Sequence, residues 1–137
     1  MSFKVLAIDD DPGITDLLAL LLKPHGFEVI TANNGEEGIR VIREQTPDVV
    51  ILDLMMPGID GWRVCTEVRK FSNVPILILS ALDNPGTVAS ALDAGADDYL
   101  VKPVPSGVLI AHLNKLTRRP EMNNRSSLKP QTAPISL

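Results

Sequence analysis

The sequence predicts an α/β protein built on a doubly wound parallel sheet. Five short runs rich in β-branched residues alternate with longer amphipathic stretches along the 137 residues of the chain. Several of these runs are apolar almost throughout, which is typical of parallel strands covered on both faces. Strict β-α alternation, five times over, favours a (βα)5 architecture with helices on both faces of one sheet.

The predicted strands are the short runs in which valine, isoleucine, leucine and aromatic residues dominate. The central run, VVIL, is the most apolar of them and is expected in the middle of the sheet. The five predicted strands are Phe3–Ile8, Phe27–Ala32, Asp48–Asp53, Pro75–Leu79 and Asp98–Val101.

The predicted helices have recognisable start and stop signals. Asp11-Pro12 combines a capping side chain with proline in the first helical turn, and Gly26 ends the same helix. Asn34 and Asn84 are capping residues for the second and fourth helices. The helices are expected between Asp11 and Gly26, between Asn34 and Pro47, over Gly61–Phe71, between Asn84 and Gly95, and over Ser106–Leu116.

Length and composition indicate one globular domain. The hydrophobic fraction is 45% and the charged fraction is 22%, values that argue against wholesale disorder. The single cysteine, Cys65, excludes an internal disulfide and a thiolate metal cage. No apolar run approaches the ~18 residues of a membrane span, and the N-terminal residues do not resemble a signal peptide. We therefore expect a cytoplasmic protein that does not contact a membrane.

The last part of the chain differs in character from the rest. The net charge is −4, which argues against general affinity for nucleic acid, yet five basic residues face a single acidic one from Asn114 onward. Residues 120–137 contain prolines, serines and asparagines without an amphipathic period. Residues 1–119 are predicted to form the domain. Residues 120–137 are predicted to be a flexible tail of a small protein or the start of a linker, and both alternatives stay open.

Polar side chains collect where the predicted strands end. The carboxyl ends of parallel strands form the edge at which open α/β sheets bind their ligands. Each residue alone has an ordinary explanation: a helix cap for Asp11, a turn for Ser80, a surface position for Lys102. Their convergence at four strand ends indicates a functional site. The residues are Asp9, Asp10, Asp11, Asp53, Ser80 and Lys102.

The chemistry of this set points to a metal ion and a phosphoryl group. Clustered carboxylates repel one another unless a cation binds among them, and oxygen ligands favour Mg²⁺. A metal held by carboxylates attracts phosphate, and Lys102 and Ser80 could bind further phosphoryl oxygens. A carboxylate can also act as the nucleophile and form an aspartyl phosphate. Asp53, at the end of the central strand, is the natural candidate.

From about Lys4 to Arg119 the chain resembles the receiver domain of two-component response regulators. Four segments carry the resemblance, in the family's order and spacing. They are VLAIDDDPGI (5–14), PDVVILDLMMPGIDGW (47–62), ILILSA (76–81) and AGADDYLVKP (94–103). The resemblance implies a flavodoxin-like fold with strand order 2-1-3-4-5.

The resemblance also implies a role for each acidic residue. Asp53 corresponds to the phosphoacceptor, which takes a phosphoryl group from a sensor histidine kinase or a phosphotransfer protein. Asp9 and Asp10 correspond to the acidic pair that holds Mg²⁺, together with Asp53 and the backbone carbonyl of Met55. The protein would then be a phosphorylated signalling domain with limited self-catalysis rather than an enzyme.

The same resemblance implies how the domain switches. Ser80 corresponds to the hydroxyl that moves toward the phosphoryl group, and the N–H of its neighbour Ala81 assists. Lys102 corresponds to the family's lysine, and the Lys102–Pro103 bond is expected to be cis. Tyr99 corresponds to the switch aromatic that turns inward when Ser80 moves, although a half-buried strand aromatic would look the same in the sequence.

The expected readout surface consists of the helix after Ser80, the last strand and the last helix. A partner protein or a second copy of the chain would bind there, and nucleic acid would be bound only through a separate output domain. The last helix follows Pro103-Val104-Pro105-Ser106-Gly107, a weak start for a helix and a departure from the common family pattern. That departure leaves a homodimer through this surface open.

Two other functions compete with this interpretation. Mg²⁺-dependent phosphatases that form an aspartyl phosphate usually carry a second acid two residues after the nucleophile, where this chain has Met55. An inert receiver-shaped interaction domain usually lacks an acid, the acceptor or the lysine, and this chain keeps Asp53 and Lys102. The signalling switch is therefore the preferred prediction.

Overall fold

A computed structural model describes residues 2–118 of the chain. It contains one five-stranded sheet whose paired strands are all parallel, in the order β2-β1-β3-β4-β5. The α/β class and the flavodoxin-like strand order are therefore confirmed. The strands are β1 (Phe3–Ile8), β2 (Phe27–Ala32), β3 (Val49–Leu52), β4 (Ile76–Ser80) and β5 (Asp98–Val101).

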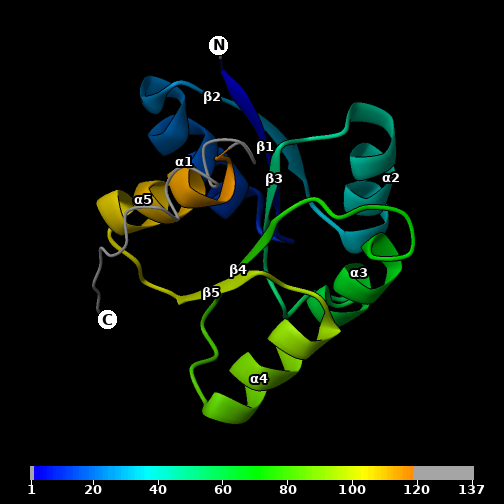
Figure 1. Ribbon diagram of the computed structural model, residues 1–137. Coiled ribbons are helices and arrows are strands. Elements are labelled where there is room, and N and C mark those ends of the chain that lie inside the picture. The colour runs from blue at the N-terminus through cyan, green and yellow to red at the C-terminus, as the bar shows by residue number, and fades with distance from the viewer. Residues whose placement is uncertain (1, 119–137) are drawn as a thin grey trace, which may run out of the picture.

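The helices cover both faces of the sheet (Figure 1). Side chains of α1 and α5 pack in the core on one face, and those of α2, α3 and α4 pack in the core on the other. Alternate residues of β1 belong to the two cores: Val5 and Ala7 to the first, Leu6 and Ile8 to the second. The helices are α1 (Pro12–Leu22), α2 (Gly35–Gln45), α3 (Gly61–Val68), α4 (Pro85–Ala94) and α5 (Ser106–Leu116), and a 3-10 helix, η1, covers Lys23–His25.

The predicted helix starts agree with the structure. Asp11, Asn34 and Asn84 each accept a hydrogen bond from a backbone N–H in the first turn of the helix that follows. No side chain caps α5, whose N-cap residue is Pro105, as expected from the weak start of this helix.

The third helix is shorter than predicted. It ends at Val68 rather than Phe71, because the N–H groups of Lys70 and Phe71 bond to carbonyls three residues back, which forms a turn. The fourth strand is displaced by one residue and ends at Ser80, whose carbonyl accepts a hydrogen bond from the Lys102 N–H.

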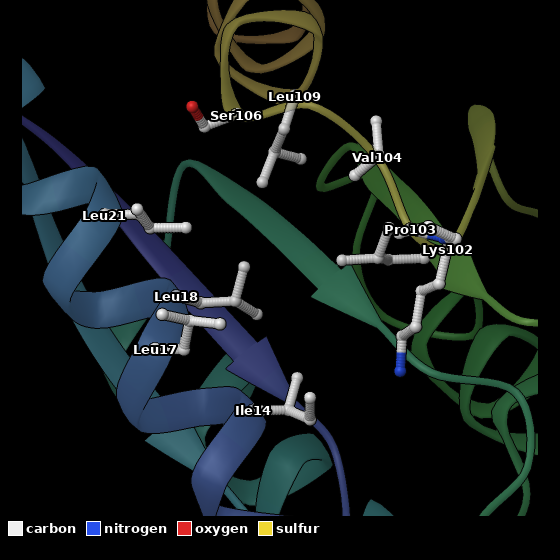
Figure 2. A pocket seen from close by; sticks show the side chains of 10 residues that line it. Ile14, Leu17, Leu18, Leu21, Lys102, Pro103, Val104, Ser106 and Leu109 are labelled. Carbon is white, nitrogen blue, oxygen red and sulfur yellow. The ribbon is translucent and has the colours of Figure 1, made fainter.

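An apolar pocket of about 250 Å³ lies between α1 and the segment that leads into α5 (Figure 2). Ile14, Leu17 and Leu21 line it from α1, and Val104 and Leu109 line it from the opposite side. Lys102 also lines the pocket, so the apolar stem of this side chain contributes to its wall. None of the helices among residues 2–118 has the length and apolar character that crossing a bilayer requires.

Candidate functional site

The register of the sheet brings two predicted acidic residues together. Ile8 pairs with Leu52 in adjacent parallel strands, so the residues that follow them, Asp9 and Asp53, leave the sheet side by side. The N–H of Asp53 donates to the carbonyl of Ile8 at 3.0 Å and continues the ladder by one bond. Asp9 is 5% exposed and Asp53 is 9% exposed.

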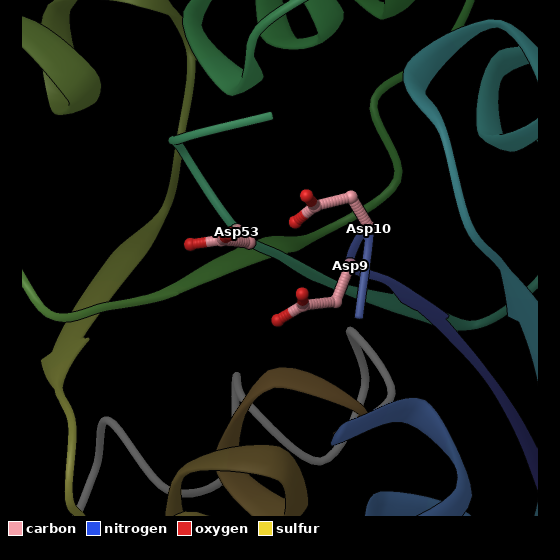
Figure 3. A group of neighbouring side chains, drawn as sticks. All are labelled: Asp9, Asp10 and Asp53. Carbon is pink, nitrogen blue, oxygen red and sulfur yellow. The ribbon is translucent and has the colours of Figure 1, made fainter. Parts of the chain in front are cut away.

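Asp10 completes a group of three carboxylates (Figure 3). One carboxylate oxygen from each of Asp9, Asp10 and Asp53 lies within 4.8 Å of the other two. Asp10 is exposed, so the cluster opens to solvent on its side. Asp11 does not belong to this group. Its carboxylate accepts a hydrogen bond from the Gly13 N–H at 2.9 Å, which confirms that it caps α1.

Lys102 supplies a cation to this cluster. Its ammonium Nζ lies 3.1 Å from Asp9 Oδ2 and 4.0 Å from Asp53 Oδ1. Its backbone N–H donates to the Ser80 carbonyl at 2.8 Å, which fixes the start of the side chain at the end of β4. The Lys102–Pro103 peptide bond is cis, as the family resemblance implied.

The charges at the site do not balance, because three carboxylates face one ammonium. Burial raises the pKa of Asp53, and the nearby Asp9 carboxylate acts in the same direction. Lys102 and backbone hydrogen bonds with Met55 and Leu54 lower this pKa, but the net direction is upward. A set of oxygen ligands with excess negative charge fits a hard divalent cation.

Gly61 allows the loop after β3 to return close to Asp53. A Cβ atom at this position would lie 2.5 Å from the Asp53 carbonyl oxygen and 2.7 Å from the Leu54 Cα, both backbone atoms. The Gly61 N–H donates to the Leu54 carbonyl at 2.9 Å. Only glycine fits this approach, so Gly61 fixes the start of α3 against the backbone next to Asp53.

Ser80 and Tyr99 both contact the loop that leads into α4. Ser80 is completely buried, and its Oγ accepts a hydrogen bond from the Leu82 N–H at 3.1 Å. The half-buried Tyr99 donates its hydroxyl to the Leu82 carbonyl at 2.6 Å. The two side chains therefore bind the two backbone polar groups of Leu82, Ser80 its N–H and Tyr99 its carbonyl. Ala81, between Ser80 and Leu82, is exposed.

The sequence reasoning missed two residues at this edge of the sheet. Asn33, directly after β2, donates its side-chain amide to the Asp9 carbonyl at 2.8 Å and to Thr15 Oγ1 at 3.2 Å. Thr15 lies in α1 and is 1% exposed. The rule that found the other residues, a polar side chain directly after a strand, also applies to Asn33 and would have found it.

The family was assigned by comparison with known proteins. Residues 5–114 match the family model of the response regulator receiver domain. This chain belongs to that family. The receiver domain is a signalling domain of two-component systems rather than a conventional enzyme, and its acidic cluster could hold a metal ion.

The relatives of this receiver domain include proteins named as transcriptional regulators. The chain is 43% identical to the transcriptional regulatory protein AfsQ1 of Streptomyces coelicolor over 90% of its own length and 55% of that protein. It is 42% identical to ycf27 of Pyropia yezoensis, named a probable transcriptional regulator, over 98% of its length and 55% of that protein. The chain thus spans about half the length of these relatives.

Solved structures agree with the assignment. The receiver domain matches the BeF3-activated N-terminal receiver domain of RstA from Klebsiella pneumoniae with a TM-score of 0.81 and 35% identity, over 85% of this chain and 99% of that one. It matches the receiver domain of the Francisella response regulator 1452 with a TM-score of 0.80 and 36% identity, over 85% of this chain and 97% of that one.

Proposed function

We propose that this receiver domain is a phosphorylation-driven switch in which Asp53 accepts the phosphoryl group. The observation that carries the proposal is the position of Asp53 beside the acidic pair and near the Lys102 ammonium, whose Nζ lies 4.0 Å from Asp53 Oδ1. Asp9 lies closer to Lys102, at 3.1 Å, and its carboxylate is one of the three that could hold a metal ion. Residues 1–119 form the switching domain in this proposal.

The transfer is a displacement at phosphorus. A carboxylate oxygen of Asp53 forms the new P–O bond, and the P–N bond to a phosphohistidine of a sensor kinase or phosphotransfer protein breaks. The departing imidazole keeps the electron pair of that bond and takes up a proton from water. Lys102 is placed to neutralise an oxygen of the transferred group, because its ammonium already lies between Asp9 and Asp53.

The residues at the site fit Mg²⁺ as the metal ion. The carboxylates of Asp9, Asp10 and Asp53 would hold it, with the backbone carbonyl of Met55 as a further ligand. When bound, Mg²⁺ would neutralise charge on the phosphoryl oxygens. Among the described residues, the cluster of potential metal ligands consists of aspartates alone, without His or Cys, and this composition supports a hard ion over zinc.

Phosphorylation would be transmitted through Ser80 and Tyr99. A phosphoryl group brings about −1.5 to −2 charges and three acceptor oxygens. Movement of Ser80 toward one of them, with the Ala81 N–H, would take its Oγ away from the Leu82 N–H, which frees one side of the loop before α4. Tyr99 holds the other side of Leu82, so the aromatic ring and the loop would move together.

The surface that reads out this change would be formed by α4, β5 and α5. Exposed apolar side chains lie on each of the three elements: Leu92, Val101 and Val108 are 43%, 38% and 41% exposed. A partner or a second copy of the chain would cover them. The names of the relatives support transcription as the process that the switch controls, with DNA contacted through an output domain and not through this acidic unit.

The test is intact-protein mass spectrometry after incubation with acetyl phosphate and Mg²⁺. We expect a single phosphoryl adduct on the native chain, lost when EDTA replaces Mg²⁺ and absent from Asp53→Asn. Asp48→Asn is the matched control, since this aspartate precedes the same strand at the opposite edge of the sheet. An adduct on folded Asp53→Asn would overturn the assignment, and no adduct on the native chain would favour an inert interaction domain.

A further inference from the structure

Asn33 contacts the acidic loop from the end of β2. Its side-chain nitrogen Nδ2 donates to the Asp9 carbonyl at 2.8 Å and to Thr15 Oγ1 at 3.2 Å. These two acceptors lie on either side of the segment that carries Asp10 and Asp11. One amide group therefore spans the loop from the end of β1 to the first turn of α1.

This contact helps to fix the peptide bond between Asp9 and Asp10, together with the hydrogen bond from the Asp11 N–H to Asp9 Oδ1 at 3.0 Å. The Asp9 N–H donates to the Ala32 carbonyl at 3.1 Å, so consecutive residues at the end of β2 hold both the N–H and the carbonyl of Asp9. The carbonyl belongs to the peptide that leads into Asp10, and rotation of that peptide would turn the Asp10 side chain. Among the described residues, no side-chain hydrogen bond holds the Asp10 carboxylate itself.

Asn33 is in turn held in place by its neighbours. Its backbone N–H donates to Glu37 Oε1 at 3.1 Å, and the Glu37 N–H donates to the capping oxygen Asn34 Oδ1 at 2.7 Å. On the other side, the buried Thr15 hydroxyl donates to the Pro12 carbonyl at 3.1 Å and presents its lone pairs to Asn33. The amide is therefore oriented before any ligand binds.

We propose that Asn33 is a positioning residue for the metal-binding acidic pair, which it orients by holding the Asp9–Asp10 peptide. This inference rests on the proposed function, in which Asp9 and Asp10 bind Mg²⁺. The neutral amide suits this position for an electrostatic reason. A lysine or arginine donor would offset the negative charge that attracts the cation, and a carboxylate would repel the Asp9 carbonyl.

The test measures Mg²⁺ affinity by isothermal titration calorimetry. For Asn33→Ala we expect a Kd for Mg²⁺ about tenfold higher than that of the native chain, the scale found when partners that orient metal ligands are removed. Thr15→Val keeps the volume but removes the second acceptor, and we expect an increase of about threefold. Thr15→Ser keeps the hydroxyl and should restore nearly native affinity.

A second readout separates positioning from general loss of structure. The rate of phosphorylation by acetyl phosphate should shift to higher Mg²⁺ concentration in Asn33→Ala but recover to within about twofold of native at saturating Mg²⁺. Asp48→Ala is the matched control, because it removes a 2.7 Å hydrogen bond from the Lys4 N–H at the opposite edge of the sheet. Its thermal stability should fall without any change in Mg²⁺ affinity.

Three outcomes would contradict the inference, and they are distinguishable. Native Mg²⁺ affinity in folded Asn33→Ala overturns the role of Asn33 and leaves the proposed function intact. Equal weakening in Asn33→Ala and Asp48→Ala assigns Asn33 a purely structural role. A native chain that binds no Mg²⁺ overturns the proposed function itself. If Asn33→Ala does not fold, the comparison of Thr15→Val with Thr15→Ser decides in its place.

Discussion

The aspartates at the two edges of the sheet have different surroundings. The strands begin at the amino edge and end at the carboxyl edge. At the amino edge, Asp48 accepts the Lys4 N–H at 2.7 Å, and Asp97 accepts both the Arg69 guanidinium at 2.9 Å and the Ile76 N–H at 2.8 Å. Each carboxylate there has a donor of its own. At the carboxyl edge, three carboxylates crowd together beside one ammonium, that of Lys102, which lies 3.1 Å from Asp9 and 4.0 Å from Asp53. Asp9 also accepts the Asp11 N–H at 3.0 Å.

The difference indicates which aspartates stabilise the fold and which are placed to bind a cation. A carboxylate that accepts backbone or guanidinium donors connects distant segments of the chain and adds stability. Carboxylates that crowd together with one cation cost stability until a ligand neutralises them. Residues of the same type, at the two ends of the same strands, therefore have different roles because at the carboxyl edge three carboxylates lie close together and at the amino edge they do not.

The largest effect on stability is expected at the amino edge, from Arg69→Ala. The guanidinium of Arg69 donates to the carbonyls of Gly95, Ser72 and Val74 as well as to Asp97. Its loss removes the donor to the three carbonyls and leaves Asp97 with the Ile76 N–H alone, so we expect the free energy of unfolding to fall by about 2–3 kcal/mol in chemical denaturation. Mg²⁺ affinity should not change.

Arg69→Lys provides the control for geometry, since an ammonium cannot reach all four acceptors at once, and should recover only part of the loss. A change below about 1 kcal/mol in Arg69→Ala, or a weaker Mg²⁺ affinity, would mean that the two edges are not independent.

At the carboxyl edge, Lys102→Met should separate stability from metal binding. The substitution keeps the apolar stem that lines the pocket and removes the cation beside Asp9 and Asp53. In metal-free buffer we expect a loss of about 1–2 kcal/mol, because the carboxylates repel without a counter-charge. The more negative cluster should bind Mg²⁺ several-fold more tightly, which titration calorimetry would measure.

Lys115→Met is the matched control for Lys102→Met. Lys115 is an exposed lysine on α5 whose Nζ lies 3.8 Å from Asp98, the first residue of β5, at the opposite end of the strand from Lys102. Its removal should change neither quantity. Weaker Mg²⁺ binding in Lys102→Met would contradict the view that the lysine and the metal ion compete for the same charge.

A smaller and opposite effect is expected from Asp53→Asn in metal-free buffer. Burial and Asp9 raise the pKa of Asp53, so the folded protein keeps this proton to higher pH than the unfolded chain does. The stability that the group contributes is fully present below the ordinary carboxyl pKa and is lost as pH rises through the raised value. Asparagine has no such loss, so the variant should be more stable than native at pH 7.

The measurement is denaturation with EDTA from pH 4 to pH 8, in which the advantage of Asp53→Asn should grow with pH and then level off. A stability difference that stays constant over this range would show that the charge of Asp53 is not what destabilises the native chain.

The sequence predicted the carboxyl edge better than the amino edge. Strand ends can be read from hydrophobic runs, and parallel strands bring those ends together, so the order of residues along the chain was enough to place Asp9, Asp53, Ser80 and Lys102 at one edge. The contacts of Arg69 could not be predicted in this way, because they join the loop after α3 to the loop after α4, whose relative positions depend on how α3 and α4 pack.

The same limit applies to other long-range contacts. His112 of α5 is half-buried, and its Nδ1 lies 2.5 Å from Asp98 Oδ2. Trp62 is partly exposed, and its indole N–H donates to Ser90 Oγ at 2.9 Å across α3 and α4. Periodicity identifies which face of a helix is buried, but not which polar side chain meets which across two helices.

The smallest expected effect concerns how α4 is attached between the two edges. At its amino-edge end, the Gly95 carbonyl is bound by the charged Arg69, which also holds three other acceptors. Further toward the carboxyl edge, α3 and α4 pack through apolar side chains, and the hydrogen bond from the Trp62 indole to Ser90 Oγ is a neutral one. A helix held more weakly at one end should move at that end, which is the end that follows Ser80 and Leu82.

Ser90→Ala tests this difference, because it removes the weaker contact and leaves the stronger one. We expect the free energy of unfolding to fall by only about 0.5 kcal/mol. The fluorescence of Trp62, the single tryptophan of the chain, should shift in the unphosphorylated variant toward the spectrum of the native chain treated with acetyl phosphate and Mg²⁺. The contrary outcome is a native spectrum that changes on phosphorylation, together with an unphosphorylated Ser90→Ala spectrum identical to that of the unphosphorylated native chain. That outcome would show that the Trp62–Ser90 bond does not restrain α4, and that the weaker attachment near the carboxyl edge lies in the loop before α4.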